Sequence, residues 1–237
     1  MTGKIRPKLL LVTIIFLFII SGLFWLDRSL ARQAYESSNT PTPVPGRTYI
    51  YFGDYYKELP RSAYVSRIIV PDTIVIHTDD QSGNIPERWN TLTTWYGLEG
   101  REGGGRSVHF GVSLDGVAQY LPMFTNAVIQ CRGVGLYTDR HSIQIEMGGR
   151  TYDYLITGKA SPEMEKSIRT TTGFTVKLTA SLMEYYKISL ENVVGHYKVG
   201  LGKSDPGQLY FEQYFLPELE KEIEKRNLNK MELSLGD

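Results

Sequence analysis

Four short stretches, far apart in the chain, constrain the fold most because each carries a side chain that can bind or serve a metal ion. They are Ile74-Val75-Ile76-His77-Thr78, Ser142-Ile143-Gln144-Ile145-Glu146, Val193-Val194-Gly195-His196 and Lys203-Ser204-Asp205-Pro206-Gly207. His77 and His196 each follow a short apolar run that is typical of a buried strand, so both can lie at one rim of a sheet.

The spacing between the second histidine and the aspartate allows a third ligand to reach the same point. Asp205 lies nine residues after His196, Gly200 and Gly202 let the intervening loop fold back, and Pro206-Gly207 favours a turn just after the carboxylate. Two imidazoles and one carboxylate would leave the fourth tetrahedral position of a zinc ion open, as in catalytic zinc sites. We therefore expect His77, His196 and Asp205 to bind Zn²⁺.

Two further residues suit hydrolysis by a metal-activated water. Glu146 alternates with apolar neighbours along its strand, so it can accept a proton from the attacking water and pass it to the leaving nitrogen. Lys203 can stabilise the negative charge that grows on the attacked carbonyl. Taken singly, each candidate also has an ordinary structural interpretation: a strand-end histidine, a salt-bridged acid, a surface lysine and a turn-forming aspartate.

The remaining histidines and the single cysteine carry weaker signals. We interpret His109 either as a strand residue that lines the substrate pocket or as part of the core, and His141 as a loop residue. Cys131 rules out an internal disulfide, because no second cysteine is present. We interpret it as a small buried apolar residue, with a nucleophilic role as the alternative.

The first 31 residues form a candidate membrane segment. Lys4, Arg6 and Lys8 precede a nearly uninterrupted apolar run, Leu9 to Leu26, of about 18 residues, close to the lower length limit for a spanning helix. This pattern predicts an uncleaved single-pass anchor over 1–31, with the rest of the chain outside the cytoplasm. A cleaved signal peptide, which would make the protein secreted, is the alternative.

The chain then changes composition twice. Residues 32–47 are rich in Pro, Ser and Thr, which predicts an extended linker, and 48–237 are long enough for a single domain with a proper core. The 26 basic and 26 acidic residues give a net charge of zero. Nucleic-acid binding therefore has little support, because it needs a concentrated positive surface.

Within the domain, strand and helix patterns alternate. We expect strands over 66–76, 108–112, 117–121, 142–147 and 190–195, with Asp115-Gly116 as the turn of a hairpin. Pro71-Asp72 marks the effective start of the first of these strands. We expect helices over 86–94, from Ser161 to about Tyr186, and over 211–226, and a glycine-rich loop over 99–106. These elements predict an α/β fold with a mixed central β-sheet flanked by helices, in a single domain behind the anchor.

Together the four stretches resemble the type 2 N-acetylmuramoyl-L-alanine amidases, a family that includes phage lysozyme-like amidases and peptidoglycan recognition proteins. The likeness spans about Thr73 to Tyr210, and His109-Phe110, Asp115-Gly116 and Tyr120 also follow the family order. The sequence departs from many relatives at Ala127–Cys131, where they carry Ala-Trp-His-Ala-Gly, and at Val108, where some carry tyrosine.

The resemblance implies a zinc enzyme that cleaves the amide between N-acetylmuramic acid and the L-alanine of the stem peptide, with peptidoglycan or muropeptide as substrate. It also implies that His77, His196 and Asp205 are the zinc ligands, and that Glu146 and Lys203 handle the proton and stabilise the transition state. A protein at the membrane surface that recognises peptidoglycan fragments without cutting them is the alternative. Binding-only relatives tend to lose a metal ligand, which this chain keeps.

Overall fold

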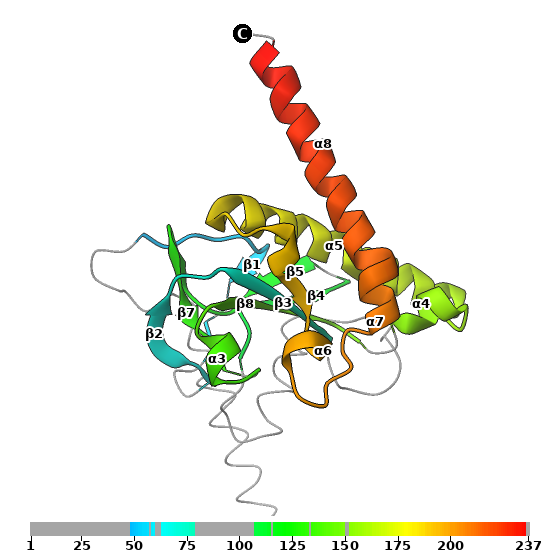
Figure 1. Cartoon of the computed structure of the whole chain (residues 1–237), viewed down its shortest axis with the longest axis horizontal. Coiled ribbons are helices and arrows are strands. Elements are labelled where there is room, and N and C mark those ends of the chain that lie inside the picture. The colour runs from blue at the N-terminus through cyan, green and yellow to red at the C-terminus, as the bar shows by residue number, and fades with distance from the viewer. Residues whose placement is uncertain are drawn as a thin grey trace, which may run out of the picture. The chain divides into compact units, whose positions relative to one another are not determined.

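The structure is a computed structural model, and it describes residues 48–56, 58–59, 63–78, 107–114, 116–132, 134–149 and 152–235. A central sheet forms the middle of this part of the chain, with two long helices on one side of it (Figure 1). The predicted mixed α/β architecture is confirmed. The predicted anchor 1–31, linker 32–47, helix 86–94 and loop 99–106 lie outside the described residues. Within those residues, no helix is long and apolar enough to cross a membrane.

Six strands form the central sheet in the order β1-β5-β4-β8-β3-β9. Their bounds are Tyr55–Tyr56 for β1, Thr73–Thr78 for β3, Phe110–Ser113 for β4, Gly116–Gln119 for β5, Ser142–Met147 for β8 and Val193–Gly195 for β9. Only β4 and β5 pair antiparallel, as the predicted hairpin, and its Gly116 has a φ of 123°, which favours glycine. The neighbours β4, β8, β3 and β9 all run parallel, so their carboxyl ends share one edge.

The predicted strand over 66–76 is wrong in its extent, although its expected effective start at Pro71-Asp72 is confirmed. The structure divides it into β2, Val65–Ile69, and β3, which belong to different sheets. The second sheet is antiparallel, in the order β2-β7-β6, with β6 at Met123–Phe124 and β7 at Ala127–Gln130. The break falls at Pro71-Asp72, since proline lacks the N–H that a continuous ladder would need.

Helix α5, Pro162–Tyr186, covers one face of the central sheet and begins as predicted. Its cap residue Ser161 accepts a hydrogen bond from the backbone N–H of Met164 at 3.2 Å, and proline occupies the first helical position. Gly173 does not interrupt it. Shorter helical segments are α3 at Leu136–Asp139, α4 at Asp153–Thr157, and the 3₁₀ turn η2 at Leu190–Asn192. Because of that turn, the strand predicted over 190–195 begins only at Val193.

The C-terminal helical run is longer than the predicted 211–226. It consists of α7, Gln208–Tyr210, the π-helical turn η3, Phe211–Phe215, and α8, Leu216–Leu235. Its first half packs against α5 through buried aromatic rings and Leu219. Beyond this contact α8 extends away from the sheet (Figure 1).

The two faces of the central sheet have different chemistry. One face joins the hydrophobic core under α5; its members include Ile74, Ile76, Ile143, Ile145, Ile168 and Val176. Since side chains alternate along a strand, the other face carries His77 from β3 and Ser142, Gln144 and Glu146 from β8. The predicted alternation of β8 is therefore confirmed, and all the polar members of that strand lie on the face away from α5.

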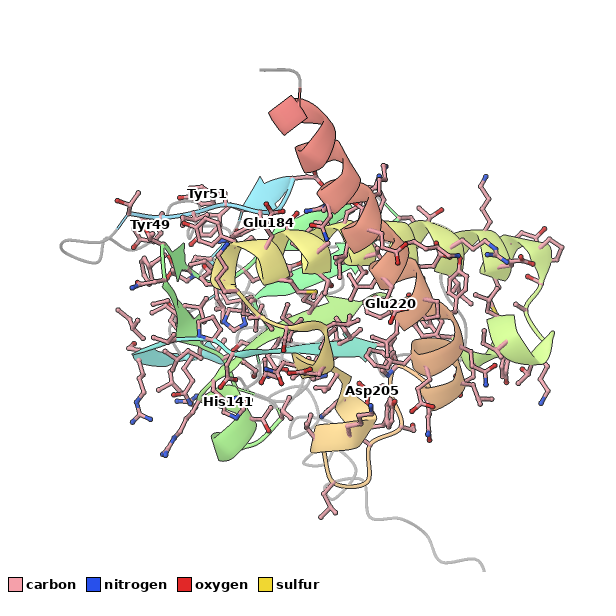
Figure 2. The ribbon with its side chains drawn as sticks, turned by 45° about the horizontal axis from the view of Figure 1, so that its top comes forward. Tyr49, Tyr51, His141, Glu184, Asp205 and Glu220 are labelled. Atoms are coloured by element: carbon pink, nitrogen blue, oxygen red, sulfur yellow. The ribbon has the colours of Figure 1, made fainter. Side chains whose placement is uncertain are left out.

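Residues 48–56 run along the outer edge of the sheet, where β1 pairs with β5. Gln119 fixes this segment: its side-chain oxygen accepts from the Phe52 N–H at 3.0 Å, and its amide donates to the Ile50 carbonyl at 3.0 Å. Figure 2 shows Tyr49 and Tyr51 of this segment well away from Asp205. The segment covers a sheet edge and lies apart from the residues discussed next.

Candidate metal centre

The parallel pairing of β3 with β9 brings the two predicted histidine ligands side by side. Ile76 pairs with Gly195, so His77 and His196 stand one residue further on, at the same edge of the sheet. His196 is also the first residue of α6, His196–Val199. Both histidines are largely buried, with exposed fractions of 6% for His77 and 5% for His196. The pairing of β3 with β9 thus brings together two histidines that are 119 positions apart in the sequence.

The loop after α6 carries Asp205 back to this edge. The backbone N–H of Tyr197 donates to the Asp205 carbonyl at 3.0 Å, and the Gly207 N–H donates to the Ser204 carbonyl at 2.9 Å. The second bond closes the predicted turn around Pro206. The Asp205 carboxylate accepts from the Thr78 N–H at 3.4 Å, at the end of β3.

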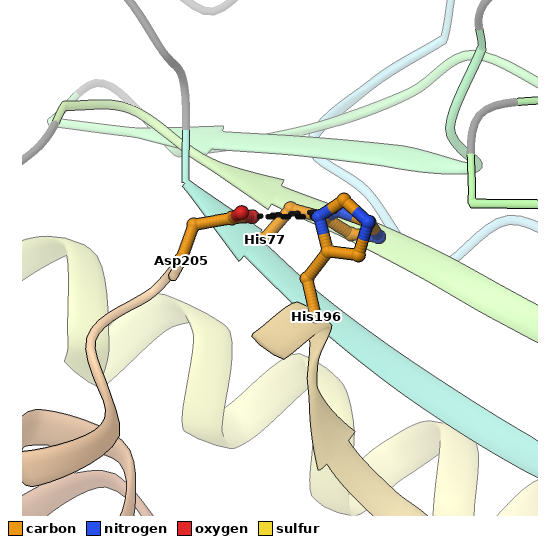
Figure 3. A group of neighbouring side chains, drawn as sticks. All are labelled: His77, His196 and Asp205. Atoms are coloured by element: carbon orange, nitrogen blue, oxygen red, sulfur yellow. Dashed lines mark hydrogen bonds and ion pairs between the residues drawn. The ribbon is translucent and has the colours of Figure 1, made fainter. Parts of the chain in front are cut away.

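Three potential ligand atoms converge on one point (Figure 3). His77 Nδ1 and His196 Nδ1 are 3.0 Å apart, and Asp205 Oδ2 is 3.0 Å from His196 Nδ1 and 3.6 Å from His77 Nδ1. A tetrahedral zinc ion with bonds of about 2.0–2.1 Å separates its ligand atoms by about 3.3 Å. The spacing and the donor set therefore fit a zinc ion that keeps a fourth position for water or substrate.

The electrostatics of Asp205 and His196 favour the protonation states that a metal requires. Burial alone would raise the pKa of Asp205, but hydrogen bonds and charge from His196 and His77 hold that pKa well below its usual range. Burial lowers the pKa of His196, and the charges of His77 and Lys203 lower it further, although Asp205 opposes them. An ionised carboxylate beside a neutral imidazole is the state that coordinates a divalent ion.

The structure also places the two predicted catalytic residues at this edge. Glu146 pairs in register with His77 on the neighbouring strand, so both side chains lie on the same face of the sheet. Glu146 is partly exposed, which a proton carrier for a substrate needs. The backbone N–H of Lys203 donates to the Gly200 carbonyl at 3.2 Å, and the side chains of Lys203 and His196 both lie beside Gly200.

His109 lies in the core. It is fully buried, its Nδ1 accepts from the Gln144 N–H at 3.0 Å, and its Nε2 donates to the Ile129 carbonyl at 2.8 Å. Both ring nitrogens are therefore used within the fold, which favours the core interpretation over substrate binding. Burial lowers its pKa to about 4, although the bond to Ile129 opposes that shift.

The buried neutral His109 predicts an acid-sensitive fold. In the unfolded chain its pKa returns to about 6.5, so the unfolded state binds the extra proton between these values. The contribution of His109 to the free energy of unfolding is complete above about pH 6.5. It is lost as pH falls toward 4, by on the order of 3 kcal/mol. Urea unfolding between pH 4 and 7, with a chelator present, should show this slope. His109→Gln cannot titrate and should reduce this slope, leaving the part due to His196, whose pKa burial also lowers. An equal slope in that variant would assign the effect to other groups.

Cys131 and His141 have structural surroundings. Cys131 is fully buried, and burial together with the Asp139 carboxylate raises the pKa of its thiol. A buried thiol that stays protonated is a poor nucleophile, which agrees with the interpretation of Cys131 as a core residue. His141 lies in a turn, as predicted, with its Nδ1 at 2.8 Å from the Asp72 carboxylate.

Gly200 gives the His196 ring the space it occupies. A Cβ atom at this position would lie 2.6 Å from His196 Cδ2 and 2.7 Å from Lys203 Cγ. Gly200→Ala should therefore displace the ring and weaken zinc binding by about 10-fold or more, a loss comparable to that of an outer partner of a ligand. Gly173→Ala in α5 is the matched control, because a Cβ there meets nothing within 4 Å. Equal zinc affinities of the two variants, measured against a competing chelator, would contradict this.

Two residues that the sequence did not single out support the site. The Gln144 side chain hydrogen-bonds His77 Nε2. The Asp153 carboxylate accepts from the Tyr210 N–H at 2.7 Å and packs against Gly207, whose φ is 106°. It thus holds the start of α7 just beyond the Asp205 turn. Alternation along β8 places Gln144 on the site face, whereas no sequence signal links Asp153 to a residue 57 positions away.

Comparison with known proteins gives a family match and several similar folds. A family profile described as N-acetylmuramoyl-L-alanine amidase matches residues 67–208. Similar solved structures include the catalytic domain of XlyA, 22% identical with a TM-score of 0.52, and a mutant endolysin from Bacillus subtilis, 22% identical with a TM-score of 0.53. Each match covers 70% of this chain and 97% of the other chain. PlyL is 17% identical, with a TM-score of 0.51 over 70% of this chain and 94% of its own.

At these identities the structural likeness shows the fold. A search of curated protein sequences found no match.

Proposed function

Because this chain belongs to the N-acetylmuramoyl-L-alanine amidase family, whose members hydrolyse an amide bond of peptidoglycan, we propose that it does so as a zinc-dependent enzyme. The bond it cleaves joins N-acetylmuramic acid to the L-alanine of the stem peptide. One observation carries the zinc dependence: His77 Nδ1, His196 Nδ1 and Asp205 Oδ2 lie within 3.0–3.6 Å of one another at one sheet edge.

Each residue of the site has a distinct part in this proposal. His77, His196 and Asp205 hold the ion, and when bound the ion acidifies water and polarises the carbonyl of the substrate. Glu146 accepts the proton of the attacking water and returns it to the alanine nitrogen as the amide bond breaks. Lys203 lies on the same loop as Asp205 and stabilises the negative charge on the carbonyl oxygen.

The chain's N-terminal sequence supports a location for this activity. We propose that 1–31 anchor the protein in the cell membrane and that 32–47 form a spacer. The domain 48–237 would then face the cell wall outside the cytoplasm. Holding the enzyme beside an insoluble polymer raises its effective concentration at the substrate. If the apolar segment is instead removed as a signal peptide, the same domain is secreted.

Product analysis tests the proposed reaction. The full chain, incubated with a defined muropeptide, should release a lactyl carboxylic acid on the sugar and a free amine on L-alanine, both detected by mass spectrometry. A ligand that is bound but remains intact would instead support a recognition protein. Cleavage between two amino acids of the stem peptide would assign the site to a peptidase.

A further inference from the structure

Gln144 connects the candidate metal ligand His77 to the core of the protein through a chain of hydrogen bonds. Its side-chain oxygen bonds His77 Nε2, and its amide nitrogen donates to Ser142 Oγ at 2.6 Å. The Ser142 hydroxyl in turn donates to the Thr138 carbonyl at 2.7 Å. Ser142 and Gln144 are 0% and 1% exposed, so water does not compete for these bonds.

The Thr138 carbonyl sets the direction of every bond in this chain. A carbonyl can only accept, so the Ser142 hydroxyl must donate to it, and the Ser142 oxygen is left to accept. The Gln144 amide nitrogen therefore faces Ser142, and its oxygen faces His77. The opposite amide orientation would put two oxygens in contact at Ser142, because the hydroxyl proton there is already used.

This direction determines which nitrogen of His77 carries the proton. A glutamine oxygen accepts only from a protonated ring nitrogen, so Nε2 carries a proton, and in the neutral ring the lone pair then lies on Nδ1. Nδ1 is the atom that lies 3.0 Å from His196 Nδ1 and 3.6 Å from Asp205 Oδ2. The donor atom thus faces the point where the three candidate ligands converge.

His196 lacks a comparable partner within the described residues. Its Nε2 is buried and makes no hydrogen bond there, and its ring is confined by the backbone at Gly200. The hydrogen bond of His196 Nδ1, to the Asp205 carboxylate at 3.0 Å, lies within the group of three candidate ligands. Among the described residues, His77 is the candidate histidine whose other ring nitrogen has a side-chain partner outside that group.

We propose that Gln144, supported by Ser142, is a positioning residue that keeps His77 in the Nε2-protonated tautomer and presents Nδ1 to the metal. This inference rests on the proposed zinc site. Hydrogen-bond partners of metal-binding histidines typically change metal affinity by about 10–100-fold when removed. The backbone of Gln144 is itself fixed, because its N–H and carbonyl both bond to His109, at 3.0 Å each.

Zinc affinity and tautomer should both respond to Gln144. In the full chain, Gln144→Leu removes the acceptor and should weaken zinc binding by about 10–100-fold in competition with a chelator. Gln144→Glu restores an acceptor for the Nε2 proton but loses the donor to Ser142, whose hydroxyl must leave the Thr138 carbonyl to bond the second carboxylate oxygen. This variant should therefore bind zinc more tightly than Gln144→Leu. In the metal-free protein, ¹⁵N NMR should show His77 protonated at Nε2, and Gln144→Leu should shift it toward a mixture of tautomers.

Gln119→Leu is the matched control. Gln119 is also a glutamine with 1% exposure on the same sheet, and its bonds hold the segment 48–56. Gln119→Leu should lower the free energy of unfolding and leave zinc affinity unchanged. Wild-type affinity in Gln144→Leu, an equal loss in Gln144→Glu, or an unchanged His77 tautomer would overturn the role of Gln144.

The two proposals fail in different ways. If the unaltered chain binds no zinc, the proposed metal site fails, and the NMR comparison still decides whether Gln144 sets the tautomer. If the unaltered chain binds zinc and cleaves muropeptide while Gln144→Leu does so equally well, only the positioning role fails.

Discussion

Asp205→Ala should abolish stoichiometric zinc binding and, with it, muropeptide hydrolysis. Asp205 supplies the only carboxylate among the three converging ligand atoms. Without it, two neutral imidazoles would face a divalent cation in a site that is largely buried. Removing a partner outside the ligand set already costs about 10–100-fold in metal affinity, so removing a ligand should cost more. Metal content after dialysis and product formation by mass spectrometry measure the two effects.

Asp205→Cys separates loss of the ligand from damage to the loop. A thiolate is a good zinc ligand, so this variant should retain bound zinc, although its different bond length will alter activity. The turn bond from Gly207 to Ser204 uses backbone atoms only and remains available in both variants. Full zinc content in Asp205→Ala would remove Asp205 from the metal site.

Glu146→Gln should keep zinc and lose about 10²–10⁴-fold in turnover, the range that a positioned proton carrier contributes. Glutamine has the shape of glutamate, and it can neither accept the proton of the attacking water nor return it to the leaving nitrogen. Glu146 is in register with His77 but is not one of the three converging ligands. Metal content should therefore match that of the unaltered chain, while kcat falls.

Glu220→Gln provides the control for this change. Glu220 is exposed on α8 and is not among the three converging ligands, so the same chemical replacement there should leave both zinc content and turnover unchanged. Normal turnover in Glu146→Gln would show that another group carries the proton. Loss of zinc in that variant would instead place Glu146 among the ligands.

The sequence predicts the site better than it predicts the element boundaries. Apolar runs that end at His77 and His196 indicate strand ends, and parallel pairing then brings those ends together. Alternation in 142–147 correctly separates the core face from the polar face, because the period of a strand is two. The convergence of Asp205 with the histidines follows from a short loop and a turn. Their role as metal ligands stays a prediction.

Other features depend on contacts that no local pattern encodes. The run 66–76 carries β-branched residues on both sides of Pro71-Asp72, so its composition indicates an interruption but does not show that the two parts join different sheets. His109 is buried, and its hydrogen-bond partner is the Ile129 carbonyl, twenty residues away in the sequence. In the sequence, Gln144 has the pattern of an ordinary polar strand residue. Its hydrogen bond to His77 is identified only once the neighbouring strand is in place. In each case the partner is remote in sequence, and only the tertiary structure identifies it.

A zinc titration of the metal-free full chain, with hydrolysis of a defined muropeptide as the readout, tests the central claim most directly. If His77, His196 and Asp205 hold one catalytic ion, the metal-free protein should be inactive, and activity should rise linearly up to one equivalent of zinc per chain and then level off. Undiminished cleavage by the metal-free protein, or an intact muropeptide at full zinc occupancy, would contradict it.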